Sequence, residues 1–114
     1  MIADSVVDLE AARLMTLSCA AAMDDVGVRN ARNKIAAIKV AVPELTYAVV
    51  DRAVQLFGGA GVSGDFFLAR TLVGLRSLRI ADGPDAVHKR TVAMFEIRAA
   101  KKKFGLKGVQ QSSL

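Results

Sequence analysis

The chain has 114 residues, of which 53% are hydrophobic and 24% are charged, and it carries a formal net charge of +5 and a mean hydropathy of +0.34. This length suits one domain, and a single cysteine excludes a secreted scaffold stabilised by internal disulfides. Charged residues interrupt each apolar run before the roughly 18 residues that a membrane span needs, so we expect a soluble, intracellular and helix-rich chain.

The first predicted helix covers residues 4–26. Two aspartates followed by Gly27 predict its end, because glycine is favoured just after the last residue of a helix. Cys19 lies in a run of small residues within this helix. No base is spaced to activate its thiol, so we predict a small core residue.

The second predicted helix covers residues 29–57. Its apolar residues form a heptad-like series, namely Ile35, Ile38, Val42, Leu45, Val49 and Leu56. Pro43 lies inside the series and removes one backbone hydrogen bond, which predicts a kink. Because the series keeps its phase across Pro43, one bent helix is favoured over two separate helices.

A short apolar helix is predicted over residues 66–75, with a connection over residues 77–83. The last helix is predicted to begin at Pro84 or Asp85, because proline is favoured in the first turn, and to end at Phe104.

Together these elements predict an all-α fold, an antiparallel helical bundle of three long helices and one short one. We expect a single domain over residues 1–104, followed by a flexible tail over residues 105–114. The mean hydropathy is high for a chain that buries only about two thirds of its unfolded surface. We therefore expect the chain to oligomerise or to belong to a longer protein.

Basic residues are concentrated at the end of the chain, where residues 88–114 hold seven lysines and arginines against one acid, Glu96. No aromatic residues alternate with them, and no zinc-finger or helix-turn-helix motif is present, so no nucleic-acid partner is expected. His88 is the only histidine, and no other residue supports a metal site, so it is predicted to be a packed or capping residue.

A glycine motif over residues 59–64, Gly-Ala-Gly-Val-Ser-Gly, matches the G-x-G-x-x-G fingerprint of dinucleotide-binding folds. That fingerprint works between a strand and a helix, whereas the heptad phase predicts a helix before it. Two alternatives are open. The glycines could end a helix and form a tight loop without a ligand, or the exposed backbone amides of such a loop could contact a cofactor's phosphate or ribose.

Two longer segments resemble one family. Residues 53–61, AVQLFGGAG, resemble the Q-x-x-G-G-x-G segment of the acyl-CoA dehydrogenases, and residues 80–88, IADGPDAVH, resemble its Y-E-G-T-x-x-I-Q segment at the same interval. Residues 8–14 and 24–27 are also similar to the C-terminal helical domain of that family. The resemblance covers roughly residues 3–100, and the A-D-G-P-D-x-V-H pattern is nearest to family members ten and eleven.

The resemblance implies an enzyme that uses FAD to desaturate an acyl-CoA thioester between its α and β carbons. Asp82 matches the position of the family's catalytic glutamate and is one methylene shorter, which reduces its reach by roughly 1.5 Å. Without the resemblance, Asp82 and Gly83 would be interpreted as a turn.

The resemblance also implies FAD contacts. Gln55, Gly58 and Gly59 match positions that contact FAD across a dimer, while Pro84 and Asp85 match the turn that faces the flavin. Asp85 is equally well interpreted as the N-cap of the last helix.

The implied partners are an acyl-CoA substrate, a second copy of the chain in a homodimer or homotetramer, and an electron-transfer flavoprotein or oxygen as acceptor. The implied compartment is the mitochondrion or the peroxisome, and the last three residues, Ser-Ser-Leu, are distantly similar to a peroxisomal address. The chain lacks the surfaces to bind flavin and acyl-CoA alone. The alternative function is therefore a non-catalytic helical module for oligomerisation or interaction.

Overall fold

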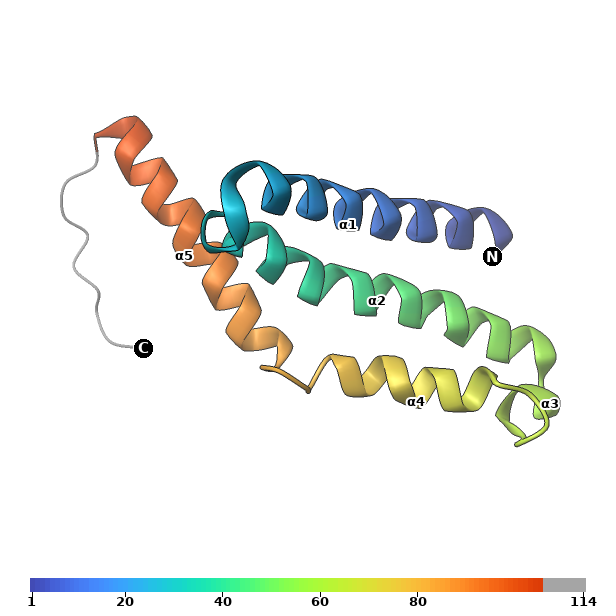
Figure 1. The fold of residues 1–114 in the computed structure, drawn as a ribbon. Helices are drawn as coiled ribbons and strands as arrows, with labels where there is room; N and C mark the ends of the chain where they lie inside the picture. The colour runs from blue at the N-terminus through green and yellow to red at the C-terminus, as the bar shows by residue number, and fades with distance from the viewer. Residues whose placement is uncertain (106–114) are drawn as a thin grey trace.

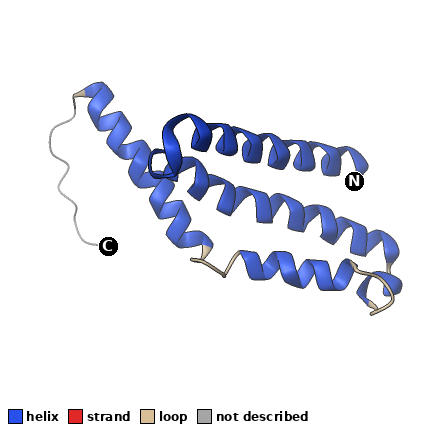
Figure 2. Ribbon diagram, viewed as in Figure 1, coloured by secondary structure: helices blue, strands red, loops and turns tan. Residues whose placement is uncertain are grey.

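The computed structural model describes residues 1–105, and every regular element in that range is a helix (Figures 1 and 2). The elements in chain order are α1 (Ile2–Asn30), α2 (Arg32–Phe57), α3 (Gly59–Val62), α4 (Leu68–Leu78) and α5 (Asp85–Phe104). The predicted all-α fold is confirmed, and the single-turn helix α3 is an addition to it. The predicted tail, apart from Gly105, lies outside the described residues. No helix in the described range is long and apolar enough to cross a bilayer.

Helix α2 is the centre of the fold. Helices α1 and α4 lie along opposite sides of α2, α5 also packs on it, and α1 contacts none of the other described helices (Figure 1). Between residues 36 and 50 of α2, Glu44 alone is exposed. A helix that is apolar around most of its circumference is stable only when neighbours cover several of its sides.

The predicted heptad series describes α2 well along most of its length. The helix continues through Pro43 as one element, as predicted, and Pro43 is buried. The predicted kink stays a prediction. Leu56, the last residue of the series, is 66% exposed, because α1 no longer covers the helix at that end.

The junction between α1 and α2 differs from the prediction. Gly27 leaves the helical conformation at φ +79°, as predicted, but residues 28–30 form another turn before the chain reverses at Ala31. The amide of Ala31 donates to the Gly27 carbonyl over 3.1 Å, and Ala31 is buried. A start of the second helix at residue 29 is therefore wrong, because residues 28–30 belong to the end of α1 and α2 begins at Arg32.

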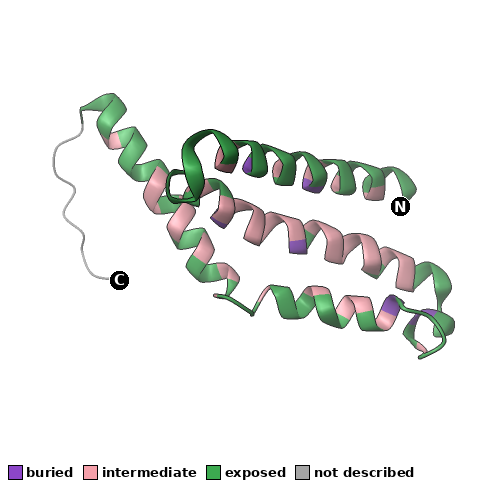
Figure 3. Cartoon of the chain, in the orientation of Figure 1, coloured by how far each residue is buried: buried purple, intermediate pink, exposed green. Residues whose placement is uncertain are grey.

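Small side chains let α1 and α2 approach each other closely. Ala12 and Cys19, both on α1, are less than 5% exposed, and Figure 3 shows buried positions on the side of α1 that faces α2. The prediction that Cys19 is a core residue is confirmed. Its thiol is free and buried.

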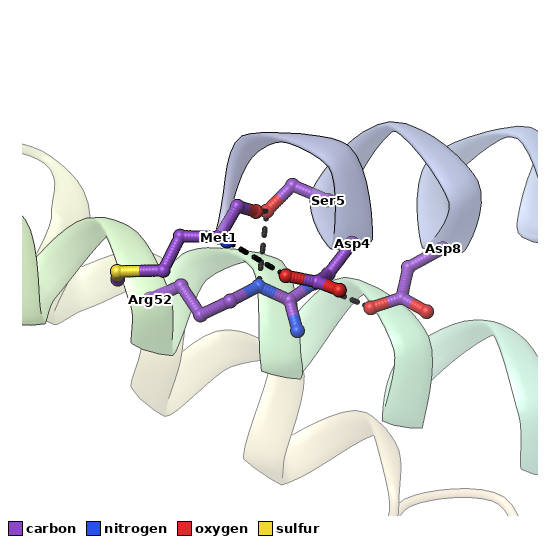
Figure 4. A network of polar contacts seen from close by, with 5 residues as sticks. All are labelled: Met1, Asp4, Ser5, Asp8 and Arg52. Carbon is purple, nitrogen blue, oxygen red and sulfur yellow. Dashed lines mark hydrogen bonds and ion pairs between the residues drawn. The ribbon is translucent and has the colours of Figure 1, made fainter.

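An arginine from α2 joins the two helices near the beginning of α1 (Figure 4). The Nε of Arg52 donates to the Ser5 hydroxyl over 2.9 Å, and its guanidinium forms an ion pair with Asp8. Both ion-pair side chains are about three-quarters buried. The two bonds fix the antiparallel register of α1 on α2, since a shift by one turn would break both.

Helix α4 begins and ends later than predicted. The prediction placed Ser77 in the connection, but its hydroxyl donates to the Val73 carbonyl over 2.9 Å, so it stays inside the helix. Phe66 precedes the helix instead of starting it, and its ring packs edge-on against Phe57 with 5.2 Å between centroids. The connection to α5 therefore covers residues 79–84.

The glycine motif follows a helix, as the heptad series predicts, and no strand occurs among residues 1–105, so the motif does not belong to a dinucleotide-binding fold. Gly58 ends α2 at φ +59°, a conformation that glycine adopts without strain. Gly61 is buried where the chain crosses α2, and a Cβ built on it would lie 2.7 Å from the Val54 carbonyl oxygen.

This close approach predicts that Gly61→Ala destabilises the chain by about 1–3 kcal/mol, because a backbone atom must move to admit the methyl group. The matched control is Gly64→Ala, where an added Cβ meets no heavy atom within 4 Å. Chemical denaturation of both variants checks the prediction. Equal midpoints for the two would contradict it.

Candidate functional site

The residues predicted to form the site lie in two groups at opposite ends of α4 (Figure 1). Gln55, Gly58 and Gly59 lie at the end of α2, beside the beginning of α4. Residues 82–85 follow the other end of α4. Because α4 has 11 residues, the two groups are separated by about 16 Å along its axis, and they do not form one compact pocket within this chain.

Asp82 lies in a tight turn between α4 and α5. The turn begins with the amide of Ala81, which donates to the Ser77 carbonyl over 2.9 Å. Asp82 then takes φ +54° and Gly83 takes φ +99°. Aspartate tolerates this left-handed region better than most residues, whereas the second position favours glycine. The residue types at positions 82 and 83 therefore suit the positive φ angles of this turn.

The side chain of Asp82 is exposed and has no hydrogen-bond or ion-pair partner within residues 1–105. The place of the Asp82 carboxylate is therefore set by the backbone conformation of the turn. Asp82 also lines an open groove of about 480 Å³ with mostly apolar walls, formed by Thr16, Ile35, Ile38, Lys39, Val42, Pro43, Leu78, Asp82 and His88. A carboxylate at an apolar groove can act as a general base on a bound molecule whose proton is acidified by a neighbouring carbonyl group.

Asp85 forms an ion pair across the turn. Its Oδ2 accepts a hydrogen bond from the Nε of Arg79 over 2.7 Å, and its amide donates to the Arg79 carbonyl over 3.3 Å. The bond from Arg79 lowers the pKa of the Asp85 carboxyl. Asp85 is the first residue of α5 and Pro84 is the N-cap, so the N-cap interpretation of Asp85 is wrong. The Asp85 carboxylate instead accepts a hydrogen bond from the guanidinium of Arg79.

The other oxygen of Asp85 is buried and unpaired. Oδ1 has no hydrogen-bond partner in the part of the chain that the structure describes. A buried carboxylate oxygen without a donor is costly, and such an atom calls for a donor from outside the chain.

Two further side chains hold the turn, and the sequence indicated only one of them. A ring nitrogen of His88 lies 3.1 Å from the Asp82 carbonyl oxygen, so the expected packed or capping role is confirmed. The ammonium of Lys39, on α2, donates to the Leu78 carbonyl over 2.5 Å and to the Gly83 carbonyl over 3.4 Å. The available signal was a single cation in an otherwise apolar stretch of α2.

The glycine group at the other end of α4 has an open backbone. Gln55, Gly58 and Gly59 are exposed, and a Cβ built on either glycine would meet no heavy atom within 4 Å. A ligand or another polypeptide can therefore approach this backbone closely. An open hollow of about 430 Å³, lined by residues between 62 and 70, lies beside it.

Metal-ligating groups are a separate question. Across residues 1–105, no three His, Cys, Asp or Glu side chains come together as metal ligands.

Comparisons with known proteins all point to one family. The sequence model described as "Acyl-CoA dehydrogenase, C-terminal domain" matches residues 1–96. The chain is 46% identical to acyl-CoA dehydrogenase family member 11 of Gallus gallus, with 93% of this chain and 14% of the relative aligned. It is 50% identical to acyl-CoA dehydrogenase family member 10 of Mus musculus, with 85% of this chain and 9% of the relative aligned.

A solved structure from Mycobacterium abscessus, assigned as an acyl-CoA dehydrogenase, has the same fold. Its TM-score is 0.85 and its sequence is 42% identical, and the match covers 87% of this chain and 24% of the other. The chain therefore spans about a quarter or less of the relatives that it matches.

The ion pair of Asp85 predicts a dependence of stability on pH. Its pKa is lower in the folded chain than in the unfolded one, so the pair stabilises the fold above the unfolded value of roughly 3.9. This contribution is lost as the pH falls through the lowered folded value. Asp85→Asn is therefore expected to melt below the wild type at neutral pH and to match it in strong acid.

Thermal unfolding between neutral and strongly acidic pH measures this difference. Asp51→Asn is the control, because Asp51 is exposed on α2 and has no ion-pair partner among the described residues. A gap between Asp85→Asn and wild type that stays constant with pH would show that the pair does not act in this way.

Proposed function

Since the chain belongs to the acyl-CoA dehydrogenase family and matches its C-terminal domain, we propose that it supplies the catalytic base and part of the FAD site of an enzyme that desaturates acyl-CoA thioesters. The observation that carries this proposal is the turn at Asp82. A carboxylate at the position of the family's base stands unpaired beside an apolar groove. The proposal concerns the whole enzyme, of which this chain would be the C-terminal part.

Asp82 would act as a general base on the α carbon of the substrate. Its carboxylate takes the α proton, a hydride leaves the β carbon, and the two electrons left on the α carbon form the new double bond. The α proton is weakly acidic, so the carboxylate must lie within contact distance in a site that excludes water. Asp82 is exposed within residues 1–105, so the covering surface would come from the remainder of the enzyme and from its ligands.

FAD would accept the hydride when it is bound. Two features of the chain fit such a group. The unpaired and buried Oδ1 of Asp85 can accept a hydrogen bond from it, beside the turn that carries Pro84. At the other end of α4, the open backbone of Gly58 and Gly59 can approach a phosphate or a ribose, with Gln55 supplying an exposed amide.

The separation of the two groups supports a dimer. We propose that residues 82–85 face the flavin of their own subunit and that the glycine group contacts the FAD of a partner subunit, in a homodimer or homotetramer. The apolar surface supports association as well. On α1, Ile2 is 79% exposed, Val6 61% and Val7 67%, and such side chains on a monomer indicate an interface.

The same exposed surface also favours a second function, a non-catalytic helical module that binds another protein. This alternative needs neither Asp82 nor a flavin. Purified protein that stays colourless and monomeric when FAD is supplied would favour it, whereas the absorbance of bound oxidised flavin would favour the enzyme.

Replacement of Asp82 tests the base directly. In the complete enzyme, Asp82→Asn is expected to lower kcat for desaturation by about 10²- to 10⁴-fold, because the amide cannot take up the proton, while FAD stays bound. Asp82→Glu is expected to retain activity, since it restores the longer reach. Turnover of the Asp82→Asn enzyme at the wild-type rate would remove Asp82 from the mechanism.

The dissociation constant for FAD tests whether the glycine group contacts the cofactor. Gly59→Ala should raise the dissociation constant for FAD by about tenfold, which corresponds to about 1.4 kcal/mol, because the methyl group would separate the backbone from the cofactor. The fold leaves this site open, so stability should not change. Gly64→Ala, equally open, is the control. If both variants bind FAD like the wild type, the glycine group is not a cofactor contact.

A further inference from the structure

The turn that carries Asp82 needs restraint from outside itself. Asp82 and Gly83 both have positive φ, and the Asp82 carboxylate has no partner within the described chain to fix its direction. A residue other than glycine persists in this conformation only when its surroundings hold the backbone. The position of the carboxylate therefore depends on whatever holds the carbonyl groups of the turn.

Most of these restraints are local to the turn. Arg79 and Asp85 close it through one side-chain and one backbone bond, and His88 contacts the Asp82 carbonyl. All three residues lie within a few positions of the turn, so they fix its internal shape. They do not join the turn directly to α2, although α4 and α5 both pack on that helix.

Lys39 supplies that connection. Its ammonium reaches from α2 to the carbonyl of Leu78, the last residue of α4, and to the carbonyl of Gly83, on the other side of the turn. The last carbonyls of a helix lack intrahelical partners, and a charged donor stabilises them well. Lys39 is half-buried, and its side chain lines the groove that Asp82 also lines.

We propose that Lys39 is a positioning residue for Asp82. By holding both sides of the turn against α2, it presents the carboxylate at one place over the groove. The ammonium is directed at backbone carbonyls, so its effect on catalysis passes through the position of the turn. This inference rests on the proposed role of Asp82 as the base.

The test uses the complete enzyme with Lys39→Met, which keeps most of the aliphatic side chain and removes the ammonium. We expect kcat to fall by about 10- to 100-fold with KM for acyl-CoA within about twofold of wild type and with full flavin content, because a small misplacement of the base affects the chemical step. Lys39→Arg keeps a charged donor and should recover much of the lost kcat. Amide hydrogen exchange over residues 79–83 should be faster in Lys39→Met.

Lys34→Met is the matched control. Lys34 also lies on α2, but its ammonium donates to the Ser18 hydroxyl of α1 over 2.8 Å and bonds neither carbonyl of the turn, so its removal should leave kcat unchanged. If Lys39→Met loses its flavin, Lys39→Gln carries the same measurements.

Two results would overturn the inference while leaving the proposed function intact. One is a wild-type kcat for Lys39→Met when Asp82→Asn is inactive. The other is unchanged amide exchange over residues 79–83. An active Asp82→Asn enzyme would instead contradict the proposed function itself, so the two failures are distinguishable.

Discussion

Burial of the central helix is the constraint on which the rest of the structure depends. Helix α2 is apolar around nearly its whole circumference, and such a helix is stable in water only when other helices cover it. Helix α1 covers one side through small residues, α4 covers the opposite side, and α5 packs on α2 as well. The end of α4 and the beginning of α5 are thereby brought to the same part of α2, and the turn between them is held where Lys39 can reach it.

The candidate base is positioned by backbone conformation and by carbonyl contacts instead of by bonds to its own carboxylate. This arrangement leaves the carboxylate oxygens free to contact a substrate. The neighbouring acid shows the contrast. The Asp85 carboxylate is paired with Arg79, while Asp82, three residues earlier, has no ion-pair partner among the described residues.

The mean hydropathy of the chain is high, yet few of the described side chains are completely buried. Ala12, Cys19, Ala31, Ala36 and Leu68 are the buried hydrophobic residues of the described range, and many larger apolar side chains are exposed. Several large side chains that would normally fill a core, such as Phe67 and Ile80, are instead more than half exposed. This surface agrees with the expectation of oligomerisation or of a longer protein, and it is also the kind of surface that could exclude water from a catalytic centre once covered.

The sequence alone determined four of the five helices, their approximate ends and the family. Spacing in α2 and the glycines at 27, 58 and 105 are local signals, because they depend on one turn of backbone and its neighbours. The same locality explains the errors. Local signals predict a connection at Ser77 and a helix start at residue 29, whereas α4 continues to Leu78 and α2 begins at Arg32. Only the tertiary structure decided that Arg79 takes the carboxylate of Asp85, that Lys39 holds the turn, and that the two groups of site residues lie at opposite ends of α4. Lys39 and Gly83 are 44 residues apart, and such a contact depends on how whole helices pack, which no local pattern of residues encodes.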